Sequence, residues 1–112
     1  MADPRIRQLF IKTGVVKRLT KEKTVCEKEI VTEQTRLEKL KTSGADDHSV
    51  RKQEEVIQEC LMMLPDAIRR LQKELEQLEK MLQDEQDLNE AKEYATATQV
   101  ISEAKEVLSH NL

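Results

Sequence analysis

The sequence predicts an all-α protein, an elongated up-down-up bundle of three helices. Charged residues make up 37% of the 112 residues and aromatic residues only 2%. That composition suits long helices and leaves too few aromatic side chains for most sandwich or α/β cores. Apolar residues recur at the three- and four-residue steps of one helix face, which favours left-handed coiled-coil packing. We expect a single domain over residues 1–112, with helices at about 4–42, 47–83 and 88–109.

The first helix is expected to begin at Asp3-Pro4, because Asp suits the N-cap and Pro suits the first helical position. Its apolar row is sparse, and Lys23 occupies a place where an apolar residue is missing. The row consists of Leu9, Val16, Ile30 and Leu37. Gly44 is expected to end this helix in the left-handed conformation that glycine adopts readily.

The second helix has the most regular apolar row, which we call the heptad seam. The seam consists of Val50, Ile57, Leu61, Leu64, Ile68, Leu71, Leu75, Leu78 and Leu82. Pro65 lies inside it, and a proline in a helix interior costs about 3 kcal/mol. Each fully buried Leu or Ile contributes roughly 1.5–3 kcal/mol as an upper bound. We therefore expect the helix to continue through Pro65 with a kink, and two helices split at Leu64 are the alternative.

The third helix is expected to start at the capping box Asp87-Leu88-Asn89-Glu90. Small residues on its inner rows, Ala97 and Ala104, would let it approach the other helices closely. Because this helix is the shortest, it should leave one end of the bundle two-stranded. We expect partial exposure there of Leu37, Val50 and Ile57.

Residues with catalytic potential are sparse. His48 is expected in a loop and His110 near the end of the chain, and neither is close in sequence to a nucleophile or a cluster of metal ligands. The sequence contains no glycine-rich phosphate loop. We expect neither enzymatic activity, nor a cofactor, nor a metal.

The cysteines, Cys26 and Cys60, are far apart and have no C-x-x-C spacing, which argues against zinc. Antiparallel pairing of the first two helices would bring them within about one turn of each other. For a cytosolic protein, buried thiols are favoured over a disulfide between them.

The net charge of −3 gives no reason to expect nucleic-acid binding, although the N-terminal segment is basic. Its cations are Arg5, Arg7, Lys12, Lys17, Arg18, Lys21 and Lys23. Antiparallel packing would place them beside Glu74, Glu76, Glu79, Asp84, Glu85 and Asp87. We expect these charges to pair within the fold, and a nucleic-acid or acidic-surface site is the alternative.

Membrane insertion and secretion find no support in the sequence. No apolar run approaches the roughly 18 residues of a membrane span, and no apolar segment of a secretory signal follows Met1. We expect a cytosolic protein, from which the sequence does not separate a nuclear one.

The candidate binding residues lie around Pro65 and are named here the Met-Arg surface. Met62 and Met63 fall on the outer face of the second helix. Contact with water does not explain an apolar pair at such a position, so the pair indicates a contact with another surface. Methionines beside arginines suit an adaptable protein-binding surface. The alternative is that a neighbouring helix covers the methionines. The surface consists of Met62, Met63, Pro65, Asp66, Arg69 and Arg70.

Several blocks of the sequence also match a known family. They are Asp3-Pro4-Arg5-Ile6-Arg7-Gln8, residues 11–19, Lys21-Glu22-Lys23, Met62-Met63-Leu64-Pro65-Asp66, Arg69-Arg70-Leu71 and Glu93-Tyr94. Over most of its length the chain resembles tubulin-binding cofactor A, the tubulin-specific chaperone A family. It departs from that family at Leu61, where Arg is frequent, and at Cys26, where Tyr is frequent. The loop at 43–48 and the tail after residue 100 match poorly.

The resemblance implies a bundle that captures quasi-native β-tubulin released from the cytosolic chaperonin and holds it for the other tubulin-folding cofactors, without nucleotide. It also implies a cytoplasmic, cytoskeleton-associated protein. The alternative is a structural or adaptor bundle with no client-folding role. Spectrin-like repeats usually bury a Trp, and the absence of Trp weighs against that alternative. We expect a monomer, because the other two helices can cover the heptad seam within one chain.

Overall fold

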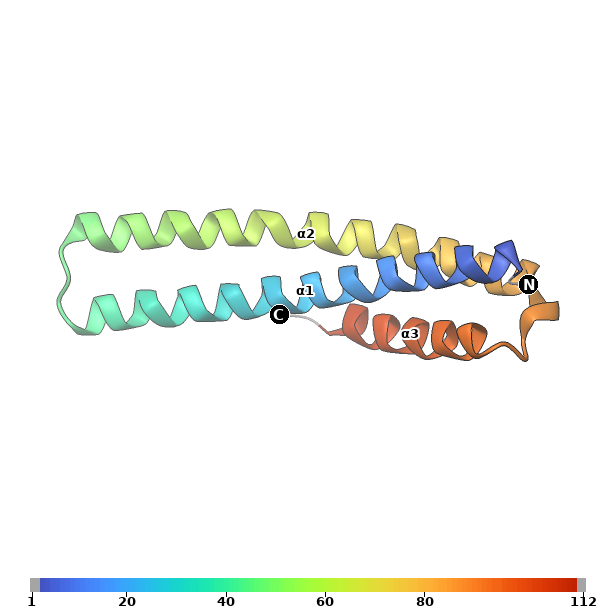
Figure 1. The fold of residues 1–112 in the computed structure, drawn as a ribbon. Coiled ribbons are helices and arrows are strands. Elements are labelled where there is room, and N and C mark those ends of the chain that lie inside the picture. The colour runs from blue at the N-terminus through green and yellow to red at the C-terminus, as the bar shows by residue number, and fades with distance from the viewer. Residues whose placement is uncertain (1–2, 111–112) are drawn as a thin grey trace.

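The computed structural model describes residues 3–110 as an antiparallel three-helix rod (Figure 1). The helices are α1 (Pro4–Thr42), α2 (Asp47–Asp84) and α3 (Lys92–Ser109), and a short 3-10 turn at Gln86–Leu88 precedes α3. The rod measures 65 × 23 × 16 Å. The predicted all-α, up-down-up bundle is confirmed. Of the expected domain 1–112, residues 1, 2, 111 and 112 lie outside the described part.

The ends of α1 are capped as the sequence predicted. The Asp3 carboxylate accepts a hydrogen bond from the Arg5 backbone N–H at 2.9 Å, and Pro4 occupies the first helical position. At the other end Gly44 has a φ of 76°. This conformation lets the N–H of Ala45 reach the carbonyl of Leu40 at 2.9 Å, which satisfies one of the last carbonyls of the helix.

The second helix continues through Pro65 without interruption. The alternative of two helices split at Leu64 is therefore wrong. Pro65 itself is exposed, so its ring does not displace core side chains. Because proline has no N–H, the Leu61 carbonyl one turn earlier loses its helical partner. A kink at this point stays a prediction.

The start of α3 differs from the prediction, because the helix begins at Lys92 rather than near residue 88. The expected capping box does not form, since the Asp87 carboxylate accepts a hydrogen bond from the Arg5 side chain at 3.1 Å instead. Leu88 is buried in a 3-10 turn, and Ala91 takes the N-cap position without a side-chain hydrogen bond. Contacts distant in sequence thus override a local helix-start signal.

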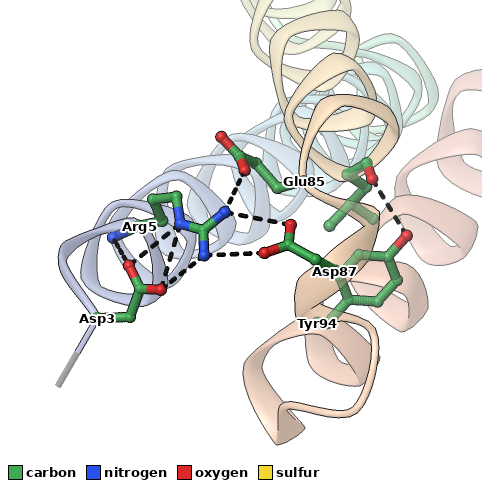
Figure 2. Close-up of polar contacts among 6 residues, drawn as sticks. Asp3, Arg5, Glu85, Asp87 and Tyr94 are labelled. Carbon is green, nitrogen blue, oxygen red and sulfur yellow. Dashed lines mark hydrogen bonds and ion pairs between the residues drawn. The ribbon is translucent and has the colours of Figure 1, made fainter. Parts of the chain in front are cut away.

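Ion pairs join the first part of α1 to the last part of α2 and the turn that follows it, which the sequence predicted would lie together (Figure 2). Arg5 reaches Glu85 at 2.7 Å and Asp87 at 2.9 Å, and Lys12 reaches Glu74 at 2.7 Å. The hydrogen bonds from Arg5 lower the pKa of the Asp3 carboxyl below its ordinary value. Pairing of the basic segment within the fold is therefore confirmed for these residues.

The core lies where all three helices meet. Its apolar side chains interdigitate from each helix, and the small residues of α3 are fully buried, as close packing of this helix requires. Figure 2 also shows the Tyr94 hydroxyl, which donates to the Leu82 carbonyl near the end of α2 at 3.2 Å. The core consists of Leu9, Val16, Leu19, Leu71, Leu75, Leu78, Leu82, Ala97, Val100, Ile101 and Ala104.

Beyond the end of α3 the rod has only two helices (Figure 1). The heptad seam is accordingly not buried uniformly along α2. Leu75 is buried, Ile68 on the same stripe is half-buried, and Leu61 is 37% exposed. The prediction that Leu61 belongs to the core is therefore wrong, because no third helix covers that side of α2. Ile57 is buried, contrary to the expectation of partial exposure, and Ile30 of α1 is buried as well.

Candidate partner-binding surface

The methionines of the Met-Arg surface project from the middle of α2. Met62 is 76% exposed and Met63 is 62% exposed. The alternative in which a neighbouring helix covers them is therefore wrong. Since the core does not require these side chains, two adjacent exposed methionines constitute an apolar feature that needs an explanation outside the fold.

The charged members of the Met-Arg surface are exposed and held by weak ion pairs. Arg69 pairs with Asp66 one turn away, and its hydrogen bond lowers the pKa of the Asp66 carboxyl below its ordinary value. Arg70 lies 3.7 Å from Glu22 on α1. Exposed pairs of this kind contribute only about 0–1 kcal/mol. Both guanidinium groups can therefore exchange their present partners for carboxylates of another protein at little cost.

A groove between α1 and α2 extends this surface onto α1. Its volume is about 400 Å³, and Met63 and Ala67 of α2 line it together with Val25 and Cys26 of α1. Charged side chains surround the apolar floor, namely Arg18, Lys21, Glu22, Glu29 and Arg70. The sequence did not indicate the α1 side of this groove, because Val25 lies in a polar stretch and off the apolar row of its helix.

Other exposed apolar side chains lie away from the Met-Arg surface. Phe10 is largely exposed and lines a shallow pocket between α1 and α3 together with Lys92 and Thr96. Val31 and Val56 are exposed in the two-helix part of the rod. Ile11, next to Phe10 in the sequence, is also exposed. Scattered apolar side chains such as Val31 and Val56 are normal on a protein surface.

Over residues 3–110, no group of three or more His, Cys, Asp or Glu side chains is placed to hold a metal ion. Within the same range no helix combines the length and apolarity needed to cross a bilayer. His48 is exposed and lies in the first turn of α2, so its expected place in a loop is wrong. His110 is exposed and follows α3 directly, near the end of the chain as predicted. What the surface offers is apolar contact through thioethers, planar donors for carboxylates, and an adjoining groove.

The fold and this surface define a small helical bundle suited to non-covalent binding of another protein. Comparison with known proteins is more specific, since the family described as Tubulin binding cofactor A matches residues 4–108. The chain belongs to this family. The resemblance drawn from the sequence is thereby confirmed.

Individual relatives agree over nearly their whole length. The chain is 47% identical to Tubulin-specific chaperone A of Gallus gallus over 105 residues, covering 94% of this chain and 97% of that protein. A solved structure of human tubulin chaperone cofactor A superposes with a TM-score of 0.80 at 42% identity, covering 91% of this chain and 99% of the human one. Tubulin folding cofactor A from Arabidopsis thaliana gives a TM-score of 0.86 at 33% identity, covering 92% and 97%.

Proposed function

We propose that this protein is a tubulin-folding cofactor that captures quasi-native β-tubulin after its release from the cytosolic chaperonin. It holds this client for the other tubulin-folding cofactors through protein-protein contacts and without nucleotide, in the cytoplasm and in association with the cytoskeleton. The observation that carries the proposal is the family match over residues 4–108. The names of the relatives support it, since they are those of tubulin-specific chaperones and cofactors.

The Met-Arg surface is the proposed contact with the client. Met62 and Met63 offer polarizable, flexible side chains that adapt to a partner's shape. Arg69 and Arg70 add planar donors suited to carboxylates, while Asp66 can pair with a cation of the partner. Pro65 removes one backbone donor in the middle of this surface. The groove lined by Met63 gives the client an apolar recess beside the charged side chains.

Met62→Ser combined with Met63→Ser is expected to weaken capture of β-tubulin while the fold keeps most of its stability. The stability is preserved because both side chains are mostly exposed in the parent protein. Truncation of interface residues at such centres can each cost more than about 1 kcal/mol of binding free energy. Pull-down from cytosolic extract with the parent and the double variant measures capture, and urea unfolding measures stability.

A matched control is Val31→Ser, which removes an exposed apolar side chain outside the Met-Arg surface. It should retain β-tubulin as the parent does. Equal capture by the double variant and the parent would contradict the surface assignment. Failure of the parent itself to recover β-tubulin would contradict the proposed function and leave a structural bundle in its place.

The protein is proposed to act as a monomer. The three-helix part of the heptad seam is covered by α1 and α3 of the same chain. Apolar side chains of the two-helix part argue against a monomer, since Leu37 and Val50 are only half-buried there and Val31, Val56 and Leu61 are exposed. Sedimentation at micromolar concentration is expected to give the mass of one chain. A stable dimer would contradict the proposal and identify that end as an interface.

A further inference from the structure

Cys26 on α1 and Cys60 on α2 face each other across the two helices. The Cys26 Sγ lies 3.9 Å from the backbone carbonyl oxygen of Cys60, although the residues are 34 positions apart in the chain. Both are free thiols, and both are half-buried rather than fully buried as the sequence predicted. The Cys26 sulfur therefore lies against the backbone of Cys60, and a bond between the two sulfurs requires rotation of the side chains.

Packed neighbours on both sides hold this pair in register. Two heptads before Cys26, Lys12 pairs at 2.7 Å with Glu74, which lies two heptads after Cys60. One heptad after Cys26, the backbone carbonyl of Glu33 accepts at 2.9 Å from Gln53, which lies one heptad before Cys60. The two cysteines are therefore opposite each other because of the regular antiparallel packing of α1 on α2, and they do not depend on a loop for their approach.

Small molecules in solution can reach Cys26, because it lines the open groove beside Met63 and Ala67. Burial, followed by the charge of Glu29, raises the pKa of each thiol above its ordinary value. The thiolate is the nucleophile, so reaction is slow at neutral pH and faster in alkaline solution. The charged groups around the pair are Glu27, Glu29 and Glu33 of α1, Glu59 of α2, and Arg18, Lys21 and Arg70 in the groove.

We propose that Cys26 and Cys60 form a reversible dithiol–disulfide site, which small disulfides such as glutathione disulfide oxidise and which crosslinks α1 to α2. The Cys26 thiolate attacks one sulfur of glutathione disulfide, forming a mixed disulfide and releasing one glutathione thiolate. The Cys60 thiolate then attacks the Cys26 sulfur and releases the second glutathione. The two protein thiols give up two protons and two electrons, and glutathione disulfide takes them up as two glutathione thiols.

The crosslink has a structural consequence that does not depend on the proposed function. It closes a loop that contains the α1–α2 turn, which restricts the unfolded chain and stabilises the folded one. It also fixes the two walls of the groove next to Met63, so the groove can no longer widen there. Oxidation or reduction of this site therefore changes the stability of the rod and the freedom of the groove to widen.

The test is oxidation of the full-length protein with glutathione disulfide at mildly alkaline pH, followed by thiol titration, mass spectrometry and urea unfolding. The expected product is a monomer that has lost both titratable thiols and two hydrogens, with the peptides of Cys26 and Cys60 linked. Its urea midpoint should rise by about 1 M or more. Dithiothreitol should reverse the change.

Cys26→Ser and Cys60→Ser are the matched controls. Each should stop at a mixed disulfide with glutathione, which adds the mass of one glutathione and leaves the urea midpoint unchanged. Three results in the parent protein would overturn the proposal: two thiols that still titrate, a mixed disulfide that persists, or a disulfide between two chains. A linked monomer whose urea midpoint does not rise would also overturn it, since the crosslink would then not act on the folded rod.

Discussion

Leu71→Ala is expected to lower the free energy of unfolding by about 2–5 kcal/mol, whereas Leu61→Ala should lower it by less than about 1 kcal/mol. Leu71 is completely buried in the three-helix core, so its truncation leaves a cavity. Leu61 is 37% exposed, so more than a third of its surface is already in water and its truncation leaves a gap open to solvent rather than a closed cavity. Urea unfolding of the two variants and the parent measures both changes.

The two substitutions are matched, because each replaces a leucine of the same helix and the same heptad seam by alanine. The difference in helix propensity between Leu and Ala therefore cancels in the comparison. Equal losses of stability would contradict the exposure of Leu61 and show that another surface covers it in solution.

The comparison of these leucines also shows what the sequence can and cannot predict about the core. The heptad spacing places Leu61 and Leu71 on adjoining rows of one apolar stripe, and both were predicted to be buried. Spacing within α2 carries no information about how far a third helix extends alongside it. The burial of Leu61 depends on where α3 ends, and that is fixed by contacts that the periodicity of α2 does not contain.

The start of α3 was mispredicted for a related reason. The sequence around Asp87 has a local helix-start pattern, and such patterns are reliable only when the side chains are free to cap. Here the Asp87 carboxylate binds Arg5, from the opposite end of the sequence, and Leu88 is buried. The capping of α1 by Asp3 and Gly44 was predicted correctly, because those hydrogen bonds lie within a few residues of each other.

The register of α2 alone predicted that Met62 and Met63 point outward, but it left open whether a neighbouring helix covers them. The structure shows both side chains exposed, with Met63 lining the groove between α1 and α2. The groove beside Met63 could not be predicted in this way. It requires Val25 and Cys26 of α1 to lie level with residues of α2, which only the packing of two helices determines.

Lys23 occupies a core position that the sequence marked as a gap in an apolar row, and the structure explains the charge there. Its side chain is only 2% exposed. The ammonium group donates to the carbonyls of Val107 and His110, at 2.7 and 3.2 Å, and pairs with Glu27 at 2.9 Å. The last carbonyls of a helix lack their usual partners one turn further on, and Lys23 of α1 donates to two carbonyls at the end of α3. The Val107 carbonyl also accepts from the His110 backbone N–H at 3.2 Å.

Lys23→Ala is expected to lower the free energy of unfolding by about 2–5 kcal/mol, because it removes a donor from the Val107 and His110 carbonyls and leaves the largely buried Glu27 carboxylate without its cation. Lys23→Met is the matched variant, since methionine replaces the aliphatic stem but not the ammonium group. It should lose less stability than alanine does and still be less stable than the parent. Urea unfolding of the three proteins separates the contribution of packing from that of the charge.

Hydrogen exchange locates the effect. In Lys23→Met the amides in the last turn of α3 should exchange faster than in the parent, because that turn opens more readily once its carbonyls lose their donor. Amides around Ile30 and Ile57, in the two-helix part of the rod, should keep their protection, since α3 does not reach them. This role would be contradicted by a methionine variant that is as stable as the parent and shows unchanged exchange in α3. In that case the hydrogen bonds of the buried ammonium group would only offset the cost of its desolvation, and the charge could be replaced without loss of stability.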